Sequence, residues 1–199
     1  MSRKSSETRN RILKAALTLL EESRGKDVRM ADIAKRAGIT RQALYLHFIT
    51  RAELLIATTH YLDALEGSEE RLAASRAART GSERLDAFIE AWGNYIPRIH
   101  GVAKALLAMK DTDQAAARAW DERMRDVRQG CEAAIKALHG DKALSSDHSV
   151  IQATDILWTM LSVRNWEQLT IECGWSQEQY IETLKSLARR LFVAETTES

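Results

Sequence analysis

The stretch ADIAKRAGITRQALYLHF, residues 31–48, places a single glycine in the middle of an apolar pattern with helical spacing. The apolar residues that recur at intervals of three and four, counted from the preceding methionine, are Met30, Ile33, Ala34 and Ala37. They occupy one face of a short helix. Gly38 permits the left-handed backbone that ends a helix, after which Ile39 turns back to the core. The stretch therefore predicts a helix, a tight turn and a second helix.

The second helix is predicted to follow Thr40, whose hydroxyl can cap the helix N-terminus. Ala43 or Leu44, together with Phe48, would face the core. The two alanines of the first helix leave room for the second helix to cross steeply and closely. This crossing projects the remaining face of the second helix away from the protein.

The outward face of the second helix carries polar and charged side chains suited to DNA. Its members are Thr40, Arg41, Gln42, Tyr45, Leu46 and His47. Arginine and glutamine can bond to base edges, tyrosine and histidine can reach phosphates, and leucine can contact a thymine methyl group. Residues 1–55 hold twelve Lys and Arg against six acidic residues, a net charge of +6, whereas the rest of the chain has −5. The alternatives are a generic helical hairpin and a chance excess of surface basic residues.

The longer stretch MADIAKRAGITRQALYLHFITRAELL, residues 30–55, resembles the DNA-binding region of TetR/AcrR family transcriptional regulators. The similarity covers about residues 8–56, and the remainder resembles the family only in length and helical character. It implies an all-α protein with an N-terminal three-helix helix-turn-helix DNA-binding domain, residues 1–55. A C-terminal helical ligand-binding and dimerisation domain, residues 56–199, would follow.

The resemblance implies DNA-binding roles for residues at matching positions, namely Arg29, Thr40, Arg41, Gln42, Tyr45, Leu46, His47 and Arg51. Within that set, the threonine, the tyrosine and the histidine match backbone-binding positions, while Arg41 and Gln42 fall where bases are read. Arg29 stands where the family commonly has Thr or Ser, Leu46 where an aromatic or His is common, and Arg51 where Lys is usual.

Basic residues also lie at the N-terminus, around the start of the first helix, which is expected from about Ser6 to Arg24 and to end at Gly25. Two alternatives stand for Arg3, Lys4 and Arg9: an arm that reaches the DNA backbone or minor groove, and a solvated tail.

Helical periodicity continues along the chain without sustained strand alternation. Further helices are expected from Thr50 and at about residues 82–97, 101–110, 113–138, 146–173 and 176–193, with a linker at 73–82. The last two have apolar residues over more of their surface than one core can bury. They favour a homodimer with a four-helix interface, as the resemblance also implies, and a monomer with a thick core is the alternative.

All five tryptophans lie in the acidic C-terminal part of the chain. The resemblance implies a ligand cavity among the helices of this part of the chain. The candidate lining residues are Trp92, Tyr95, Trp120, Met124, Asp155 and Trp158. Core packing is the alternative for each aromatic residue. A carboxylate such as Asp155, within an apolar helix, could anchor a cationic ligand, pair with an Arg, or lie in solvent.

The sequence contains no motif that would indicate an enzyme or a metal-binding protein. It lacks a glycine-rich phosphate loop, HExxH and GxSxG, and its five histidines and two cysteines have no metal-ligand spacing. We therefore expect no enzyme activity, cofactor, metal or membrane segment, and a cytoplasmic location. The favoured function is a homodimeric repressor released from a palindromic DNA operator by a small-molecule effector. The alternative is a DNA-binding dimer without such an effector, controlled by a protein partner or by abundance.

Overall fold

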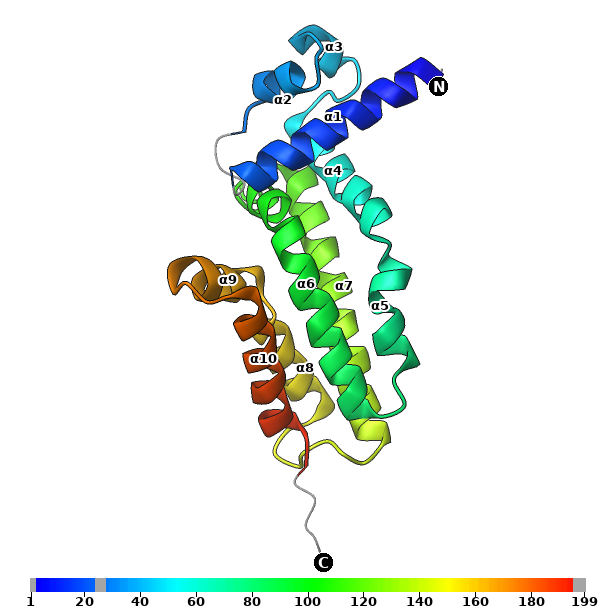
Figure 1. Ribbon diagram of the computed structural model, residues 1–199, viewed down its shortest axis with the longest axis vertical. Helices are drawn as coiled ribbons and strands as arrows, with labels where there is room; N and C mark the ends of the chain where they lie inside the picture. Colours follow the sequence, from blue (N-terminus) through cyan, green and yellow to red (C-terminus); the bar gives the residue numbers. More distant parts are fainter. Residues whose placement is uncertain (1–2, 24–27, 195–199) are drawn as a thin grey trace, which may run out of the picture. The chain divides into compact units, whose positions relative to one another are not determined.

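A computed structural model describes residues 3–23 and 28–194, without the side chains of residues 3, 4 and 68. Its helices are α1 (Arg3–Glu22), α2 (Met30–Arg36), α3 (Arg41–Tyr45), α4 (Arg51–Glu66), α5 (Ser68–Ala77), α6 (Gly81–Leu107), α7 (Gln114–Gly140), α8 (Val150–Met160), α9 (Val163–Trp166), the π-helical η1 (Glu167–Glu172) and α10 (Gln177–Phe192) (Figure 1). In the described ranges the only β-type pairing is one bridge between Leu144 and Val193. The all-α prediction is confirmed.

The chain divides into two compact units. The first unit comprises Met1–Gly67 and Pro97–Arg123, and the second comprises Ser68–Ile96 and Met124–Ser199. The long helices α6 and α7 therefore contribute residues to both units. The expected domain boundary between residues 55 and 56 falls inside α4 and stays a prediction.

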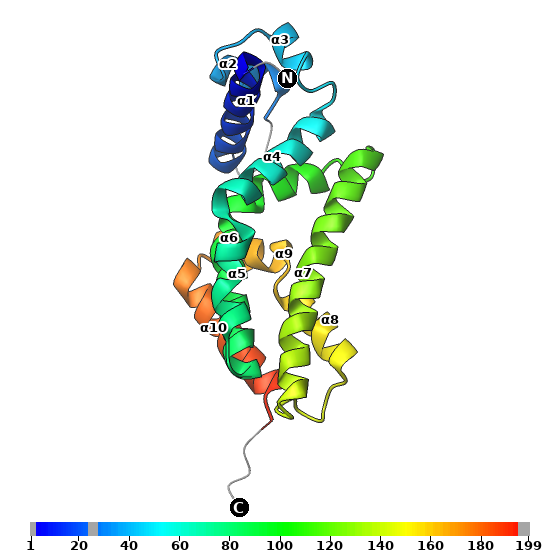
Figure 2. The same cartoon turned by 90° about the vertical axis from the view of Figure 1, so that its right-hand side faces the viewer.

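The first unit is built around α1, which packs against α2 and α4, while α2 packs against α3 (Figure 2). Its buried apolar side chains include Ile12, Ala16, Leu20, Ile33, Leu44, Phe48, Leu54 and Leu55. These are the positions at which the helical periodicity places one apolar face on each helix. The predicted end of the first helix, Gly25, lies outside the described residues.

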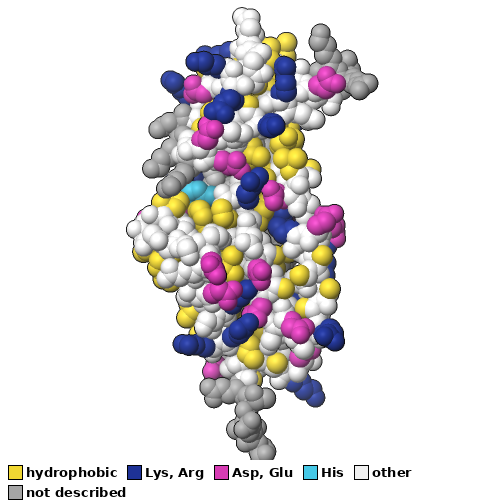
Figure 3. Space-filling model, viewed as in Figure 1, with side chains coloured by type: hydrophobic (Ala, Val, Ile, Leu, Met, Phe, Trp, Pro, Cys, Tyr) yellow, Lys and Arg dark blue, Asp and Glu magenta, His cyan; other side chains and the backbone are white. Residues whose placement is uncertain are grey.

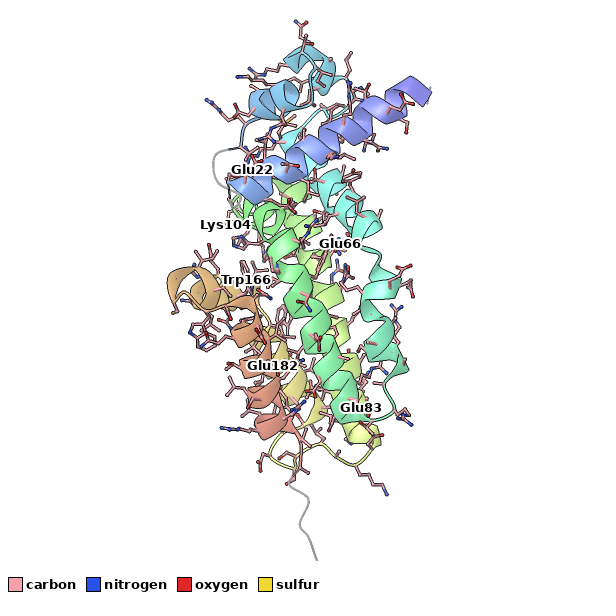
Figure 4. The ribbon with its side chains drawn as sticks, viewed as in Figure 1. Glu22, Glu66, Glu83, Lys104, Trp166 and Glu182 are labelled. Carbon is pink, nitrogen blue, oxygen red and sulfur yellow. The ribbon has the colours of Figure 1, made fainter. Side chains whose placement is uncertain are left out.

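Helix α6 runs without interruption through Pro97, so the predicted break between residues 97 and 101 is wrong. Proline removes one hydrogen bond from a helix interior. The helix continues here with Ile96 and Ile99, on either side of Pro97 in the sequence, both buried. Within the first unit, Arg98 forms ion pairs with Glu21 of α1 (Nε–Oε1, 3.7 Å) and Glu66 of α4 (Nη2–Oε1, 3.1 Å). Glu66 is labelled in Figure 4. One turn of α6 is thereby tied to the two helices that carry the helix-turn-helix.

In the second unit, α10 packs against α8 and η1. Its buried side chains include Leu85, Ile89, Ile135, Leu138, Leu157, Leu184, Ala188 and Phe192. Ion pairs join α10 to α6, since Lys185 Nζ lies 2.7 Å from Glu90 Oε2 and Arg189 Nε lies 2.9 Å from Asp86 Oδ1.

Figure 3 shows acidic and basic side chains interspersed over the visible face rather than segregated.

The single helix expected over residues 146–173 is divided in the structure. Helix α8 ends at Met160, Ser162 caps a new helix by accepting a hydrogen bond from Asn165 N at 3.2 Å, and η1 completes the segment. A serine that bonds to the backbone competes with helix continuation, which explains the break.

Candidate nucleic-acid interface and effector cavity

The turn between α2 and α3 has the geometry that its glycine predicts. Gly38 has φ +67°, in the left-handed region. The amide of Ile39 donates to Ala34 O at 3.0 Å and that of Gly38 to Lys35 O at 3.2 Å, which is the Schellman pattern of a helix C-terminus. Ala34 and Ala37 are buried, as the close crossing requires.

Helix α3 is capped by Thr40, whose Oγ1 accepts a hydrogen bond from Ala43 N at 3.1 Å. It ends at Tyr45, earlier than expected, and a turn closed by Phe48 N donating to Leu44 O at 3.0 Å follows. Leu44 and Phe48 are fully buried. These two anchors fix which face of α3 remains in solvent.

The exposed face of α3 brings the predicted base-reading residues together. Arg41 and Gln42 are exposed, and Tyr45 is 38% exposed. Arg41 Nη2 donates to Tyr45 Oη at 3.4 Å, and the guanidinium carbon lies 5.6 Å from the tyrosine ring centroid. This contact holds the arginine against α3 with its other nitrogens available to an acceptor.

Two exposed apolar side chains adjoin this face. Leu46 is 87% exposed and Ile49 is 78% exposed. Sequence reasoning selected Leu46 but missed Ile49, which it gave no role. The position of Ile49 directly after Phe48 could have indicated its exposure. Neighbouring residues in a turn point in different directions, so a buried Phe48 leaves Ile49 in solvent.

The end of the α3 turn is fixed from α1 by Arg9. Its Nη1 donates to His47 O at 3.3 Å, and its guanidinium carbon lies 4.2 Å from the Phe48 ring centroid. Because α1 begins at Arg3, the first basic residues belong to a helix and not to a tail, and their contact with DNA stays a prediction. The side chain of His47 itself is half-buried.

The predicted phosphate contacts at Arg29 and Arg51 lie at helix N-termini. Arg29 precedes α2, and both its backbone N and its Nε donate to Asp32 Oδ2, at 3.1 and 3.2 Å. These hydrogen bonds hold the pKa of Asp32 below its usual value. Arg51 is the first residue of α4 and is half-buried. The guanidinium of Arg29, with 79% of its side chain exposed, is the more accessible of the two.

A cavity of about 170 Å³ lies in the second unit. It is lined by Trp92, Met124, Val127, Trp158, Thr159, Leu161, Ser162 and Val163. Three of the six predicted ligand residues, Trp92, Met124 and Trp158, are among them. No lining side chain is charged, so the cavity offers apolar surface and two hydroxyl groups.

The remaining predicted ligand residues lie elsewhere. Tyr95 is buried, with its ring centroid 5.9 Å from that of Trp92, but does not line the cavity. Trp120 belongs to the first unit and is half-buried. Asp155 is exposed and pairs with Arg128, whose Nη2 lies 2.6 Å from Oδ1. The pairing explains how a carboxylate is accommodated on an apolar helix.

Trp92 closes one side of the cavity through a hydrogen bond to the end of α8. Its Nε1 donates to Leu161 O at 2.7 Å, and the residue is 8% exposed. The indole therefore presents its ring, not its N–H, to the cavity. On the same unit, α8 and α10 leave apolar side chains in solvent: Ile151 is 68%, Leu187 42% and Leu191 39% exposed.

In the part of the chain that the structure describes, no group of three or more His, Cys, Asp or Glu side chains could hold a metal ion. None of the described helices is both long and apolar enough to cross a membrane.

Residues 12–58 match the model of the family described as bacterial regulatory proteins, tetR family. The HTH-type transcriptional regulator CymR of Pseudomonas putida is 41% identical over 69 residues, 34% of either chain. The nucleoid occlusion factor SlmA of Marinomonas sp. (strain MWYL1) is 33% identical over 63 residues, 32% of either chain. The alignment thus spans about a third of the length of these curated relatives.

Solved structures resemble the chain over nearly its whole length. A Saccharomonospora viridis protein in complex with choline has a TM-score of 0.82 at 17% identity, over 96% of this chain and 100% of that one. A TetR-family transcriptional regulator from Agrobacterium tumefaciens has a TM-score of 0.75 at 17% identity, over 96% and 100%. At this identity the likeness establishes the fold.

The family match covers the helix-turn-helix, and the structural likeness extends to the helices that follow it. The family that this model describes consists of regulatory proteins. Residues 12–58 thus match the tetR family of bacterial regulatory proteins, and the chain as a whole has the fold of a solved TetR-family transcriptional regulator.

Proposed function

We propose that the protein is a homodimeric transcriptional repressor that binds a palindromic DNA operator and is released from it by a small molecule. The observation that carries this proposal is the solvent-exposed face of α3. There Arg41, Gln42 and Tyr45 project from a short helix whose other face is anchored by buried Leu44 and Phe48. A rigid helix with outward base-reading side chains suits the major groove.

The residues on this face take different parts in binding. Arg41 and Gln42 read base edges, since both present paired hydrogen-bonding groups. Tyr45 contacts phosphate, and Leu46 contacts a thymine methyl group, which suits its large exposed area. Thr40 keeps its hydroxyl proton for a phosphate oxygen, because its Oγ1 only accepts in the cap.

Phosphate contacts outside the face complete the interface. Arg29 and Arg51 contribute positive charge at the N-termini of α2 and α4, where helix dipoles also favour anions. His47 reaches the backbone from the turn after α3. These contacts set affinity and register rather than sequence preference.

Dimerisation is proposed through α8 and α10, because exposed apolar side chains on adjacent helices favour burial against a second copy. Ile151, Leu187 and Leu191 supply that surface. Two-fold symmetry then places two recognition helices in successive major grooves, roughly 34–36 Å apart, and selects a palindromic operator.

The proposed effector site is the cavity beside Trp92 and Trp158. A space of about 170 Å³ admits a molecule of roughly benzene size. Indole faces attract apolar groups and also quaternary ammonium ions, of which choline, bound by the Saccharomonospora viridis protein, is one. Asp155 is not used as an anchor, because it pairs with Arg128 outside the cavity.

Helix α6 is the proposed route from effector to DNA. It carries Trp92 at the cavity, and further along the same helix Gly101 lies against the end of α1 and Arg98 pairs with Glu21 and Glu66. A ligand that favours a different position of α6 would shift α1 and α4 and change the separation of the recognition helices. Such coupling requires only different affinities for two states.

The second candidate is the same DNA-binding dimer without a small-molecule effector. It is favoured by the modest size of the Trp92 cavity, since ligand sites commonly exceed about 300 Å³. In that case a protein partner or the abundance of the dimer controls operator occupancy.

Selection of bound fragments from the source genome tests the proposal, followed by affinity measurements on the selected operator. Losing Gln42 should relax preference at one or two base pairs of each half-site, whereas losing Arg51 should lower affinity for all sequences and reduce the salt dependence by about two ions, one for each subunit. If both variants lose affinity uniformly, Gln42 does not read bases. An effector is then sought among compounds that release the operator, and Trp92→Ala should abolish that release.

A further inference from the structure

We propose that Arg71 and Tyr95 form a receptor for the carboxylate of a small organic acid. Arg71 lies on α5 and Tyr95 on α6, both in the second unit. The guanidinium carbon of Arg71 lies 3.7 Å from the centroid of the Tyr95 ring. The Tyr95 residue is 2% exposed, and Arg71 is half-buried.

The first argument is an unsatisfied donor. The Nη1 atom of Arg71 is buried and has no hydrogen-bond partner. No carboxylate among the described residues forms an ion pair with Arg71, and Glu69 on the same helix pairs with Arg76 instead. A guanidinium keeps its charge at any physiological pH, and a buried donor without an acceptor is unfavourable. Arg71 Nη1 is therefore a hydrogen-bond donor that an anionic oxygen could satisfy.

The second argument is preorganisation. Stacking on Tyr95 fixes the plane of the guanidinium, and a planar fork of N–H groups matches a carboxylate with two parallel hydrogen bonds. An ammonium at this position would lack that fork. The geometry favours a carboxylate over a neutral amide of the same shape.

The third argument is the neighbourhood of the ring. Tyr95 contacts Trp92, which lines the apolar cavity, and the two residues are three apart on α6 and share a face. The ligand class is accordingly a small acid with an apolar body. Binding of the acid involves no DNA and does not depend on the proposed function. Only the identification of that acid as the effector rests on the proposed function.

The test compares benzoate, phenylacetate and hexanoate with their uncharged amides, using the thermal unfolding midpoint of the full chain at pH 7. Binding to the folded state raises the midpoint. We expect at least one acid to bind the wild type about tenfold or more tightly than its amide. Arg71→Met should remove that preference and Arg71→Lys should retain part of it. Arg76→Met, the matched control on the same helix, should keep it in full.

A ligand-free measurement separates a binding role from a structural one. The substitution Arg71→Met removes the stacking of Arg71 on Tyr95 but breaks no ion pair. It should therefore leave the unfolding midpoint within about 4 °C of the wild type. A larger fall, or a wild type that binds no acid of the panel better than its amide, overturns the inference. If acids bind through Arg71 yet leave the operator occupied, the inference stands and the effector part of the proposed function fails.

Discussion

Replacing Gly101 by alanine should destabilise the protein, because there is no room for a side chain where α6 meets α1. A Cβ atom at this position would lie 2.6 Å from the carbonyl carbon of Leu20 and 3.1 Å from Glu21 N, and closer still to Leu20 O. All three are backbone atoms, so no rotamer change can relieve the contact. The two helices would have to separate by more than about 1 Å to restore ordinary van der Waals distance.

The size of the effect follows from two opposing terms. Overpacking against a backbone that cannot rotate away costs about 3 kcal/mol, the upper end of the usual range. Alanine in a helix interior recovers about 1 kcal/mol relative to glycine. The expected loss in the free energy of unfolding is therefore about 2 kcal/mol, which lowers the unfolding midpoint of a chain this long by about 4–8 °C.

Thermal and urea unfolding measure this loss, and Gly140→Ala is the matched control. Gly140 is the last residue of α7, and a Cβ atom added there would meet no atom within 4 Å, so its replacement should stabilise the protein by about 0.5 kcal/mol. If Gly101→Ala proves as stable as the wild type, α6 does not approach α1 as described. The proposed route from effector to DNA would then lose its contact point.

Three further changes probe separate contacts. Arg9→Ala should lower the free energy of unfolding by about 1–2 kcal/mol in urea, because its stacking and hydrogen bond at the α3 turn are lost. Trp92→Phe should cost about 1–3 kcal/mol in the same assay by removing the donor to Leu161 O. Burial raises the pKa of Cys131 to about 12, so a thiol reagent at pH 8 should modify only exposed Cys173 until the protein unfolds.

Each of these has a clear contrary result. Unchanged urea midpoints for the Arg9 and Trp92 variants would mean that neither hydrogen bond is formed in solution. Modification of two thiols in the native state, at comparable rates, would show that the core around Cys131 opens readily.

The helix-turn-helix could be predicted from the sequence because its determinants are local. Gly38 ends one helix, Thr40 caps the next, and the alternation of apolar and polar residues selects the exposed face of α3. Each of these effects acts within a few residues along the chain. The role of Arg9 could not be found in this way, because its partners lie about forty positions further on and only the packing of α1 brings them together.

The helices that follow the helix-turn-helix were harder to predict because tertiary packing overrides local signals there. Pro97 lies inside a continuous helix, although prolines usually mark helix ends. The resemblance implied a cavity among these helices, and two of the candidate lining residues, Trp92 and Trp158, line the cavity in the second unit. Composition could not distinguish these two tryptophans from Trp120, which belongs to the first unit. All three tryptophans lie on helices whose apolar residues have a similar spacing.

The affinity of the selected operator for Arg41→Ala and Tyr45→Ala at physiological salt tests the central claim most directly, with Arg76→Ala as the control for loss of one exposed arginine. Each lost contact costs about 1–3 kcal/mol and occurs twice in a dimer, so affinity should fall by roughly thirtyfold or more. Both variants should remain folded and dimeric, and the control should bind as the wild type does. Unchanged operator affinity in the α3 variants would contradict the claim that this face reads DNA.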